Sequence, residues 1–383
     1  MKTLPYGISS THGRHVLRAG LFVIGLMACF ALVASTVQAQ NYYVKDMGFI
    51  PESKAYDPAG LNNQGQVVGT AMAGEYGYAF RYYYNGKEDE MERVGNLGSR
   101  AFGISPDGIV VGDAYVQKLG WVSHAVFFKG SAAVELGALK GDLFSRANGI
   151  NAMHQIVGTS GLGRDAAQSR AFIWTATDGM IDLGTLGGIY AQAYAINDAG
   201  WVTGTSQIPD MSMGTHAFVY RPLSPTPDYI VPMRDLGTLG GHHSCGMSIN
   251  VINHVAGSST IDWSDKTTHA FFYDGKTMID LGVLGKNDPA YQSVALGVNN
   301  SDQVVGFSSA PVGKTNQIDQ TAFVWSRDLN DGQMVNLNSL IAGWSERYYL
   351  ISATAINDHG QIAARAWDYQ EGTLKAVLLT PTK

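Results

Sequence analysis

Hydrophobic and polar residues alternate over short stretches along nearly the whole chain, which is the pattern of half-buried β-strands. Phe172 and Trp174 lie two positions apart and therefore share one face of a strand. The same spacing recurs in the pairs Phe80 and Tyr82, Phe218 and Tyr220, Phe271 and Tyr273, and Phe323 and Trp325. Asn, Asp and Gly follow these stretches at positions suited to tight turns. The pattern predicts an all-β chain of short strands.

Three motifs recur seven times each and divide the chain into repeats. The first has the form Leu-Asn-Asn-Gln-Gly-Gln-Val-Val-Gly, and its last residue falls at Gly69, Gly112, Gly158, Gly204, Gly257, Gly306 and Ala364. The second is an Ala-Phe strand, with its alanine at Ala79, Ala125, Ala171, Ala217, Ala270, Ala322 and Ala376. The third is Asp-Leu-Gly or a variant, centred at Met47, Val94, Leu136, Leu183, Leu236, Leu281 and Leu337. Each repeat predicts four strands, a to d: the run into Ile-Asn, then Val-Val-Gly, Ala-Phe and Asp-Leu-Gly.

Seven four-stranded repeats of about 49 residues each over positions 40–383 are typical of a seven-bladed β-propeller. The alternative is an open β-solenoid, which caps its ends with polar repeats. Here residues 42–46 form a strand d without its own a to c, and residues 374–379 form a strand c without a d. The two ends therefore complete one blade, as a closed ring without exposed edges requires. We expect pairing of the N- and C-terminal strands to close the ring.

The sequence resembles the HAF family of extracellular repeats, which is named for a His-Ala-Phe motif. His216-Ala217-Phe218, followed by Asp-Leu-Gly-Thr-Leu-Gly-Gly at 235–241 and again the same run at 182–188, carries the resemblance. It extends over 40–383 and is weakest in the last repeat, where Ala364 and the segment 375–377 depart from the pattern. The resemblance implies a secreted or envelope protein, and it brings no established activity or catalytic residues.

The first 39 residues have the composition of a secretory signal peptide. Basic residues precede an apolar run at 20–34, and Val37 and Ala39 stand at positions −3 and −1 of a cleavage site. We expect cleavage near Ala39, which leaves residues 40–383 as the exported chain, extracellular or periplasmic. A lipoprotein site at Cys29 is the alternative, but the hydrophobic run continues beyond that cysteine. No second run approaches the ~20 apolar residues of a membrane-spanning helix, so we expect no membrane span.

Composition narrows the range of partners. Gly accounts for 46 of 383 residues and charged residues for 15%, as in a turn-rich β protein. Lys and Arg number 26 against 32 acidic residues, so we expect no basic face for nucleic acid. Only Cys245 remains after position 39, which excludes an internal disulfide. We expect a monomer without a cofactor.

Length variation between repeats is concentrated in the b-to-c and d-to-a connections, which share one face of the predicted disc. They are the segments 113–123, 160–169, 207–215, 258–268 and 308–320 between b and c, and 139–145, 286–291 and 340–350 between d and a. Long connections on one side of a rigid scaffold are a common place for binding sites. We call this side the variable face and expect the site there. A Pro-rich insertion at 222–232 lies between c and d and is interpreted as a stiff decoration of the opposite face.

Two recurrent polar positions have simpler explanations than ligand binding. His124, His216 and His269 open the third strand, but equivalent positions of different blades lie too far apart to bind one metal ion, so we expect a local polar role. Asparagines before the a-to-b turns are interpreted as turn caps, with lining of the central channel as the alternative. They are Asn62, Asn151, Asn197, Asn250, Asn299 and Asn357, with Ser105 in the remaining repeat. No metal site is predicted.

Candidate binding residues on the variable face are aromatic side chains and a histidine pair. The aromatic candidates are Trp121, Tyr190, Trp263, Tyr291 and Trp344, together with Tyr348 and Tyr349. Asp262 and Asp265 flank Trp263, and an aromatic ring beside carboxylates suits stacking on a sugar or a peptide. His242 and His243 lie in a d-to-a loop but lack a partner pair at zinc spacing. Packing of these rings against a neighbouring blade is the alternative interpretation.

Three functions remain open from the sequence. The first is a binding propeller whose variable face takes a glycan, a peptide or an envelope partner. The second is a secreted lyase or hydrolase that acts on a polymer at the channel mouth. Catalysis would require titratable groups that converge, such as His242 and His243 with acidic loop residues around one pocket. The third is a structural envelope protein. No catalytic residue is predicted.

Overall fold

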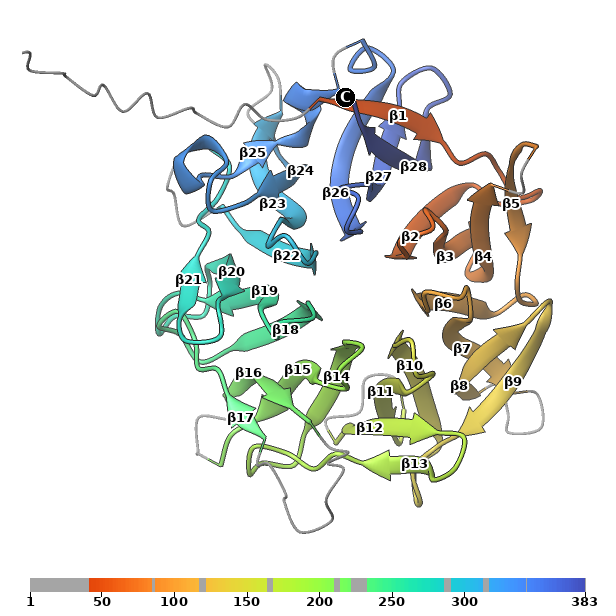
Figure 1. The fold of residues 1–383 in the computed structure, drawn as a ribbon, viewed down its shortest axis with the longest axis vertical. Helices are drawn as coiled ribbons and strands as arrows, with labels where there is room; N and C mark the ends of the chain where they lie inside the picture. Colours follow the sequence, from red (N-terminus) through yellow and green to blue (C-terminus); the bar gives the residue numbers. More distant parts are fainter. Residues whose placement is uncertain are drawn as a thin grey trace, which may run out of the picture. The chain divides into compact units, whose positions relative to one another are not determined.

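The protein is described by a computed structural model over residues 41–84, 87–116, 122–163, 168–209, 214–221, 233–285, 291–312, 317–341 and 343–382. Within these residues, 28 strands form seven four-stranded sheets. The sheets are arranged as blades around a central axis (Figure 1). The predicted seven-bladed β-propeller is confirmed. The predicted signal peptide at 1–39, its alternative at Cys29 and the insertion at 222–232 lie outside the described residues.

Six blades are each formed by four consecutive antiparallel strands, with strand a nearest the axis (Figure 1). Blades 1 to 3 are β2 (Ala55–Leu61), β3 (Val67–Ala73), β4 (Tyr76–Tyr84) and β5 (Asp89–Arg93); β6 (Ser99–Ile104), β7 (Val110–Val116), β8 (Val122–Lys129) and β9 (Ala132–Gly137); and β10 (Phe144–Ile150), β11 (Ile156–Gly161), β12 (Arg170–Thr175) and β13 (Gly179–Asp182). Blades 4 to 6 are β14 (Ala191–Ile196), β15 (Val202–Gln207), β16 (Thr215–Tyr220) and β17 (Arg234–Asp235); β18 (Ser244–Ile249), β19 (Val255–Thr260), β20 (Thr268–Tyr273) and β21 (Met278–Asp280); and β22 (Ser293–Val298), β23 (Val304–Val312), β24 (Gln317–Trp325) and β25 (Val335–Asn336). Short 3-10 turns flank β25 at Asn330–Gly332 and Leu337–Leu340.

Blade 7 is formed by both ends of the chain. Its inner strands are β26 (Tyr348–Ile356), β27 (Ile362–Asp368) and β28 (Thr373–Pro381), and β1 (Tyr42–Asp46) is added as the outermost strand. β1 pairs antiparallel with β28, from Tyr42 opposite Pro381 to Asp46 opposite Val377. The orange β1 and the dark blue β28 lie side by side in Figure 1. The predicted closure of the ring by the terminal strands is confirmed.

The hydrophobic core lies in the seams between neighbouring blades. The motif phenylalanines are fully buried, at 0% exposure for Phe80, Phe172, Phe218, Phe271 and Phe323. Phe218 of blade 4, for example, packs in one cluster with Val157 and Ala171 of blade 3. The glycine of Val-Val-Gly is required by a close approach, because a Cβ at Gly158 would lie 1.9 Å from the carbonyl oxygen of Arg146. The repeat motifs are therefore explained by the packing of strands and blades.

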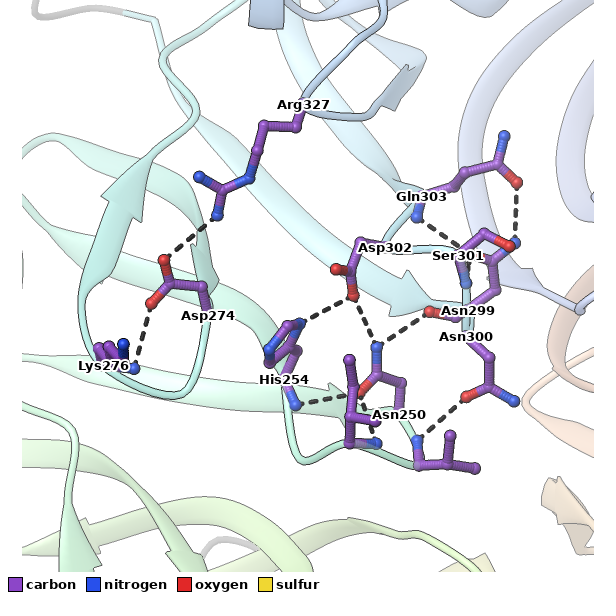
Figure 2. A network of polar contacts seen from close by, with 12 residues as sticks. Asn250, His254, Asp274, Lys276, Asn299, Asn300, Ser301, Asp302, Gln303 and Arg327 are labelled. Carbon is purple, nitrogen blue, oxygen red and sulfur yellow. Dashed lines mark hydrogen bonds and ion pairs between the residues drawn. The ribbon is translucent and has the colours of Figure 1, made fainter.

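The asparagines before the a-to-b turns cap these turns and also join the blades. The Asn250 Oδ1 atom accepts hydrogen bonds from the backbone amides of Ile252 at 3.2 Å and His254 at 3.0 Å. Its Nδ2 atom donates to the carbonyl oxygen of Asn299 in the next blade at 3.1 Å and to Asp302 at 2.8 Å (Figure 2). The predicted turn cap is confirmed, and the same side chain is a link between blades.

Equivalent amide-to-carbonyl bonds of 2.8 to 3.1 Å connect six of the seven neighbouring blade pairs. They start from Asn62, Asn151, Asn197, Asn250, Asn299 and Asn357, and we call this set the amide ring. The pair of blades 2 and 3 differs, because Ser105 replaces the asparagine. There the imidazole of His154 in blade 3 contacts Asp107 of blade 2 at 2.9 Å.

The histidines that open the third strands pair with the Asp-Leu-Gly carboxylate of their own blade. The Nδ1 atom of His216 lies 2.8 Å from a carboxylate oxygen of Asp235. The same cross-strand pair is formed by His124 with Glu135, His269 with Asp280, Arg170 with Asp182 and Lys375 with Asp46. The predicted local polar role is confirmed. The pairing explains why His-Ala-Phe and Asp-Leu-Gly recur together.

These pairs predict a loss of stability in acid. Burial raises the pKa of Asp235 and of Asp280. The hydrogen bonds from His216 and His269, the backbone amides of Gly237 and Gly282 and the histidine charges together outweigh it, so both pKa values lie below the usual range. A carboxylate with a lowered pKa stabilises the fold above its unfolded pKa of about 3.9, and the stabilisation disappears as the pH falls through the folded value. We expect the free energy of unfolding, measured with urea at each pH, to fall progressively below about pH 4. The Asp235→Asn variant should show a shallower decline, and an equally steep one would contradict this explanation.

Two connections predicted to be loops on the variable face are extended hairpins. β23 and β24 stay paired out to Val312 opposite Gln317, within the segment 308–320. β7 and β8 likewise stay paired out to Val116 opposite Val122. The expectation of loops is wrong there, because strand pairing continues past the blade edge. Among the described residues, none belongs to a helix with the length and hydropathy of a membrane crossing.

Candidate functional site between blades 4 and 5

A pocket of about 500 Å³ lies between blades 4 and 5, toward the variable face. Its walls come from the d-to-a loops that precede β14 and β18, and from the ends of strands b and c in both blades. The lining residues are Ile189, Tyr190, Tyr194, Thr205, Gln207, Thr215, His243, Ser244, Cys245, Ser258, Ser259, Thr260 and Thr268. We call it the inter-blade pocket. It has the concave shape and the size of a small-ligand site.

Most of the described residues that line the inter-blade pocket carry a hydroxyl or an amide group, and no Asp, Glu, Lys or Arg is among them. The hydroxyls of Tyr190, Ser258 and Thr268 form no hydrogen bond within the described part of the chain. Burial raises the pKa of Tyr190 and of Cys245 to about 12, so both groups stay protonated at neutral pH. Cys245 is therefore not a nucleophile there, because the thiolate is the reactive form. The pocket combines neutral hydrogen-bonding groups with apolar surface.

Two histidines and one carboxylate meet at the rim of the pocket. Asp265 accepts a hydrogen bond from the backbone amide of His242 at 2.9 Å, and its other oxygen lies 2.6 Å from Nδ1 of the same histidine. The Nε2 atom of His243 lies 4.0 Å from that second oxygen, and its Nδ1 atom lies 3.1 Å from the Thr215 hydroxyl. The backbone hydrogen bond from His242 holds the pKa of Asp265 at about 2. The rim therefore has a fixed carboxylate that orients one imidazole.

Trp263 stands on the same loop as Asp265 and is 79% exposed. Its ring lies edge to face with His242, with ring centroids 4.8 Å apart. The carboxylate of Asp262 caps this turn, because it accepts hydrogen bonds from the backbone amide and the hydroxyl of Ser264 at 2.7 and 2.5 Å. Trp263 is thus an exposed stacking surface beside the pocket, held in place by a capped turn.

The structure brings together most of the residues predicted from the sequence. Tyr190 and His243 line the pocket, and His242, Asp262 and Trp263 belong to its rim or to the loop beside it. Tyr291 precedes β22 in blade 6 and is not among the pocket's lining residues. Trp121 lies outside the described residues.

The expectation of exposed aromatic rings is wrong for two residues of the loop before β26. Tyr348 is 1% exposed, and Trp344 is partly buried against the hydrophobic cluster of blades 6 and 7. The Trp344 ring lies between Tyr43 and Tyr348, with centroid distances of 5.2 and 6.3 Å. Both rings pack against β1 and β26, and their role is to support the closing blade.

The polar pairs at the ends of strands b and c were missed by the sequence analysis. Gln207 lies opposite Thr215 in blade 4, and Thr260 lies opposite Thr268 in blade 5. The sequence contains a signal for this site, because the run Asp-Leu-Gly-Thr-Leu-Gly-Gly occurs at 182–188 and at 235–241, directly before the first strands of blades 4 and 5. Its last glycine is needed for the wall, because a Cβ at Gly241 would lie 2.1 Å from the Thr260 hydroxyl oxygen.

Few polar or titratable side chains line the described part of the central channel. A space of about 260 Å³ in the channel is lined mostly by glycine and aliphatic residues of strands a. The carboxylates Asp198 and Asp358 lie at the a-to-b end, where they accept hydrogen bonds from the backbone amides of Ala152 and Asn300. The candidate site therefore lies in a seam between blades and not at the channel mouth.

Fold and site together define a seven-bladed propeller with a neutral polar pocket between two blades. Residues 188–376 match a family described as a protein of unknown function, DUF3466. No curated protein matches the sequence.

Among solved structures, the chain is similar to the β-propeller domain of the Trilobed protease from Pyrococcus furiosus, with a TM-score of 0.57 and 8% identity, over 86% of this chain and 96% of that one. That propeller is described as having an open velcro topology, whereas β1 and β28 are paired here. Weaker matches are a puromycin-hydrolyzing peptidase of Mycobacterium tuberculosis (TM-score 0.46, 13% identity, 82% of this chain and 49% of that one) and the Pyrococcus horikoshii acylaminoacyl peptidase (0.44, 11%, 83% and 51%). The chain spans about half the length of these two peptidases. At such identities the similarity concerns the fold alone.

Proposed function

We propose that the protein is an exported binding propeller that takes a neutral glycan in the inter-blade pocket. The observation that carries the proposal is the lining of the pocket. Most of its described residues carry a hydroxyl or an amide group, two of them are tyrosines, and none has a carboxylate, an amine or a guanidinium. Sugars present many hydroxyls and apolar ring faces, so they require neutral donors, neutral acceptors and aromatic surfaces. Trp263 supplies such a surface next to the pocket.

A neutral glycan fits this pocket better than a charged peptide does. A charged group that enters a pocket needs a partner of opposite charge, and no carboxylate, amine or guanidinium is among the described lining residues. The hydroxyls of Tyr190, Ser258 and Thr268 have no hydrogen-bond partner among the described residues, so they can bond a ligand. The leader-like residues before position 40 and the resemblance to HAF repeats support an exported or envelope location.

The test is a glycan array probed with the protein, followed by titration calorimetry of the best ligand. We expect Trp263→Ala and Gln207→Ala each to weaken binding by about 2 kcal/mol or more, as at other binding hot spots. The melting temperature should be unchanged in Trp263→Ala and slightly lowered in Gln207→Ala, because the Gln207 Oε1 atom accepts a hydrogen bond from the backbone amide of Ile189. The matched control is Tyr84→Ala, because Tyr84 is 65% exposed and ends strand c on the opposite face. Its affinity should stay within about 0.5 kcal/mol of the parent.

Two outcomes would overturn the proposal. One is equal affinity of the parent and the pocket variants for the array ligand. The other is loss of binding in Tyr84→Ala, which would place the contact on the opposite face.

A second candidate function is hydrolysis or elimination on the bound polymer, and the rim cluster favours it. His242 and His243 converge with Asp265 beside one pocket, which is the arrangement that general base catalysis needs. No hydroxyl nucleophile lies within hydrogen-bonding distance of His242 among the described residues. Analysis of the glycan after long incubation distinguishes the two functions. Intact glycan supports binding alone, while cleavage that His243→Ala abolishes supports catalysis.

A further inference from the structure

A second pocket, of about 330 Å³, lies between blades 1 and 2. Like the inter-blade pocket, it is formed where strands b and c of one blade face the d-to-a loop and strand a of the next. Its chemistry is different, because aromatic rings, a methionine and two carboxylates are among its lining residues. Its charged and tyrosine residues are Asp57, Glu75, Tyr76, Arg100 and Tyr115.

Two tyrosines form an aromatic corner in this pocket. The rings of Tyr76 and Tyr115 stand nearly perpendicular, at 77°, with centroids 6.0 Å apart. Tyr115 lies directly over the backbone of Gly98, where a Cβ would come within 2.4 Å of its ring. Gly98 has a φ of +88°, so this position disfavours any other residue. The corner is therefore fixed by the backbone, and both tyrosines line the pocket.

The charges around the corner leave an excess of one negative group. Arg100 is bound at 2.9 and 2.5 Å by the two oxygens of Asp113, whose side chain has no exposed surface, so its positive charge is cancelled. Asp57 is paired with Arg365 at 3.3 Å. Glu75 forms no ion pair within the described residues. The balance favours a cationic ligand over an anionic one.

We propose that this pocket binds an alkylammonium group, as found in choline or in a lysine side chain. Aromatic faces attract such a cation through the quadrupole of the ring, and a carboxylate at the rim adds a direct ionic contact. Tyr76 and Tyr115 supply the aromatic rings, and Glu75 supplies a carboxylate that has no ion pair within the described residues. This pocket is separate from the inter-blade pocket, so the proposal does not depend on the proposed function.

The test is calorimetry or NMR titration of the full chain with choline and with its neutral carbon isostere, 3,3-dimethylbutan-1-ol. We expect choline to bind at least about tenfold more tightly than the isostere. Glu75→Gln should weaken choline binding about tenfold, and Tyr76→Leu should weaken it by a similar factor. Asp328→Asn removes an exposed carboxylate from blade 6 and is the matched control, with unchanged affinity expected. A parallel titration with N-acetyl-lysine amide tells whether a primary ammonium is preferred over a quaternary one.

Three results would overturn the proposal: equal affinities for choline and the isostere, no binding of either cation at millimolar concentration, or equal weakening by Glu75→Gln and Asp328→Asn. Both substituted positions are on the surface, and the melting temperature of each variant identifies any that fails to fold. In that case Glu75→Asp, which keeps the charge, provides the comparison, and retained choline binding is expected.

Discussion

Deletion of residues 374–383 should nearly abolish folding. The segment includes most of β28, where Val377 and Leu379 are 0% exposed and Leu378 is 6% exposed. Each such side chain contributes about 1.5 to 3 kcal/mol on burial, against a total stability of roughly 5 to 15 kcal/mol for a protein domain. The deletion also removes the pairing partner of β1, so that both the seam and the edge of blade 7 are lost.

Circular dichroism and urea denaturation measure the loss of folding in the truncated protein. The control is to add the missing strand back as a separate peptide. A peptide of residues 373–383 should restore the melting transition of the truncated protein, because it can add β28 between β27 and β1. The same peptide with Leu379→Asp should not restore it, since a carboxylate would enter the seam. A truncated protein that melts within a few degrees of the parent would show that ring closure contributes little.

Features that the sequence repeats could be predicted from the sequence. The Val-Val-Gly glycines, the Ala-Phe strands and the Asp-Leu-Gly turns recur because every blade meets its neighbours in the same way. Because the same environment occurs seven times, the residues that it requires recur in the sequence. The first strand continues the pattern of the last repeat, which indicates that both belong to one blade. Strand order and the identity of the closing blade follow from these patterns alone.

The candidate site could be predicted only in part, because it is formed by positions that do not repeat. Gln207 and Thr260 are separated by 53 positions and line the same pocket, because β15 and β19 belong to neighbouring blades. Aromatic residues in loops also cannot be divided into packed and exposed ones from the sequence. Trp263 is exposed at a capped turn, whereas a turn from Ile341 to Trp344 directs the Trp344 ring onto Tyr43.

Replacement of Asn250 by Leu should destabilise the propeller by about 3 to 5 kcal/mol, because a buried donor or acceptor left without a partner costs about 1 kcal/mol or more. Asn250 is 3% exposed, and it bonds two backbone amides of its own turn, the Asn299 carbonyl and Asp302 (Figure 2). Leu has nearly the same volume but none of these bonds, so packing changes little. Urea denaturation measures the difference in the free energy of unfolding.

Ser105 occupies the one repeat position at which the amide ring lacks an asparagine, so adding an asparagine there tests the same links in the opposite direction. Ser105 already caps its own turn, since its Oγ atom accepts a hydrogen bond from the backbone amide of Ile109 at 2.8 Å. An asparagine there can keep this cap and donate from Nδ2 to the Asn151 carbonyl, as the other six do. Ser105→Asn should therefore stabilise the protein by about 0.5 to 1.5 kcal/mol, the net contribution of one hydrogen bond. If Ser105→Asn does not raise stability and Asn250→Leu costs no more than the roughly 2 kcal/mol of its two turn-cap bonds, the links between blades contribute nothing measurable.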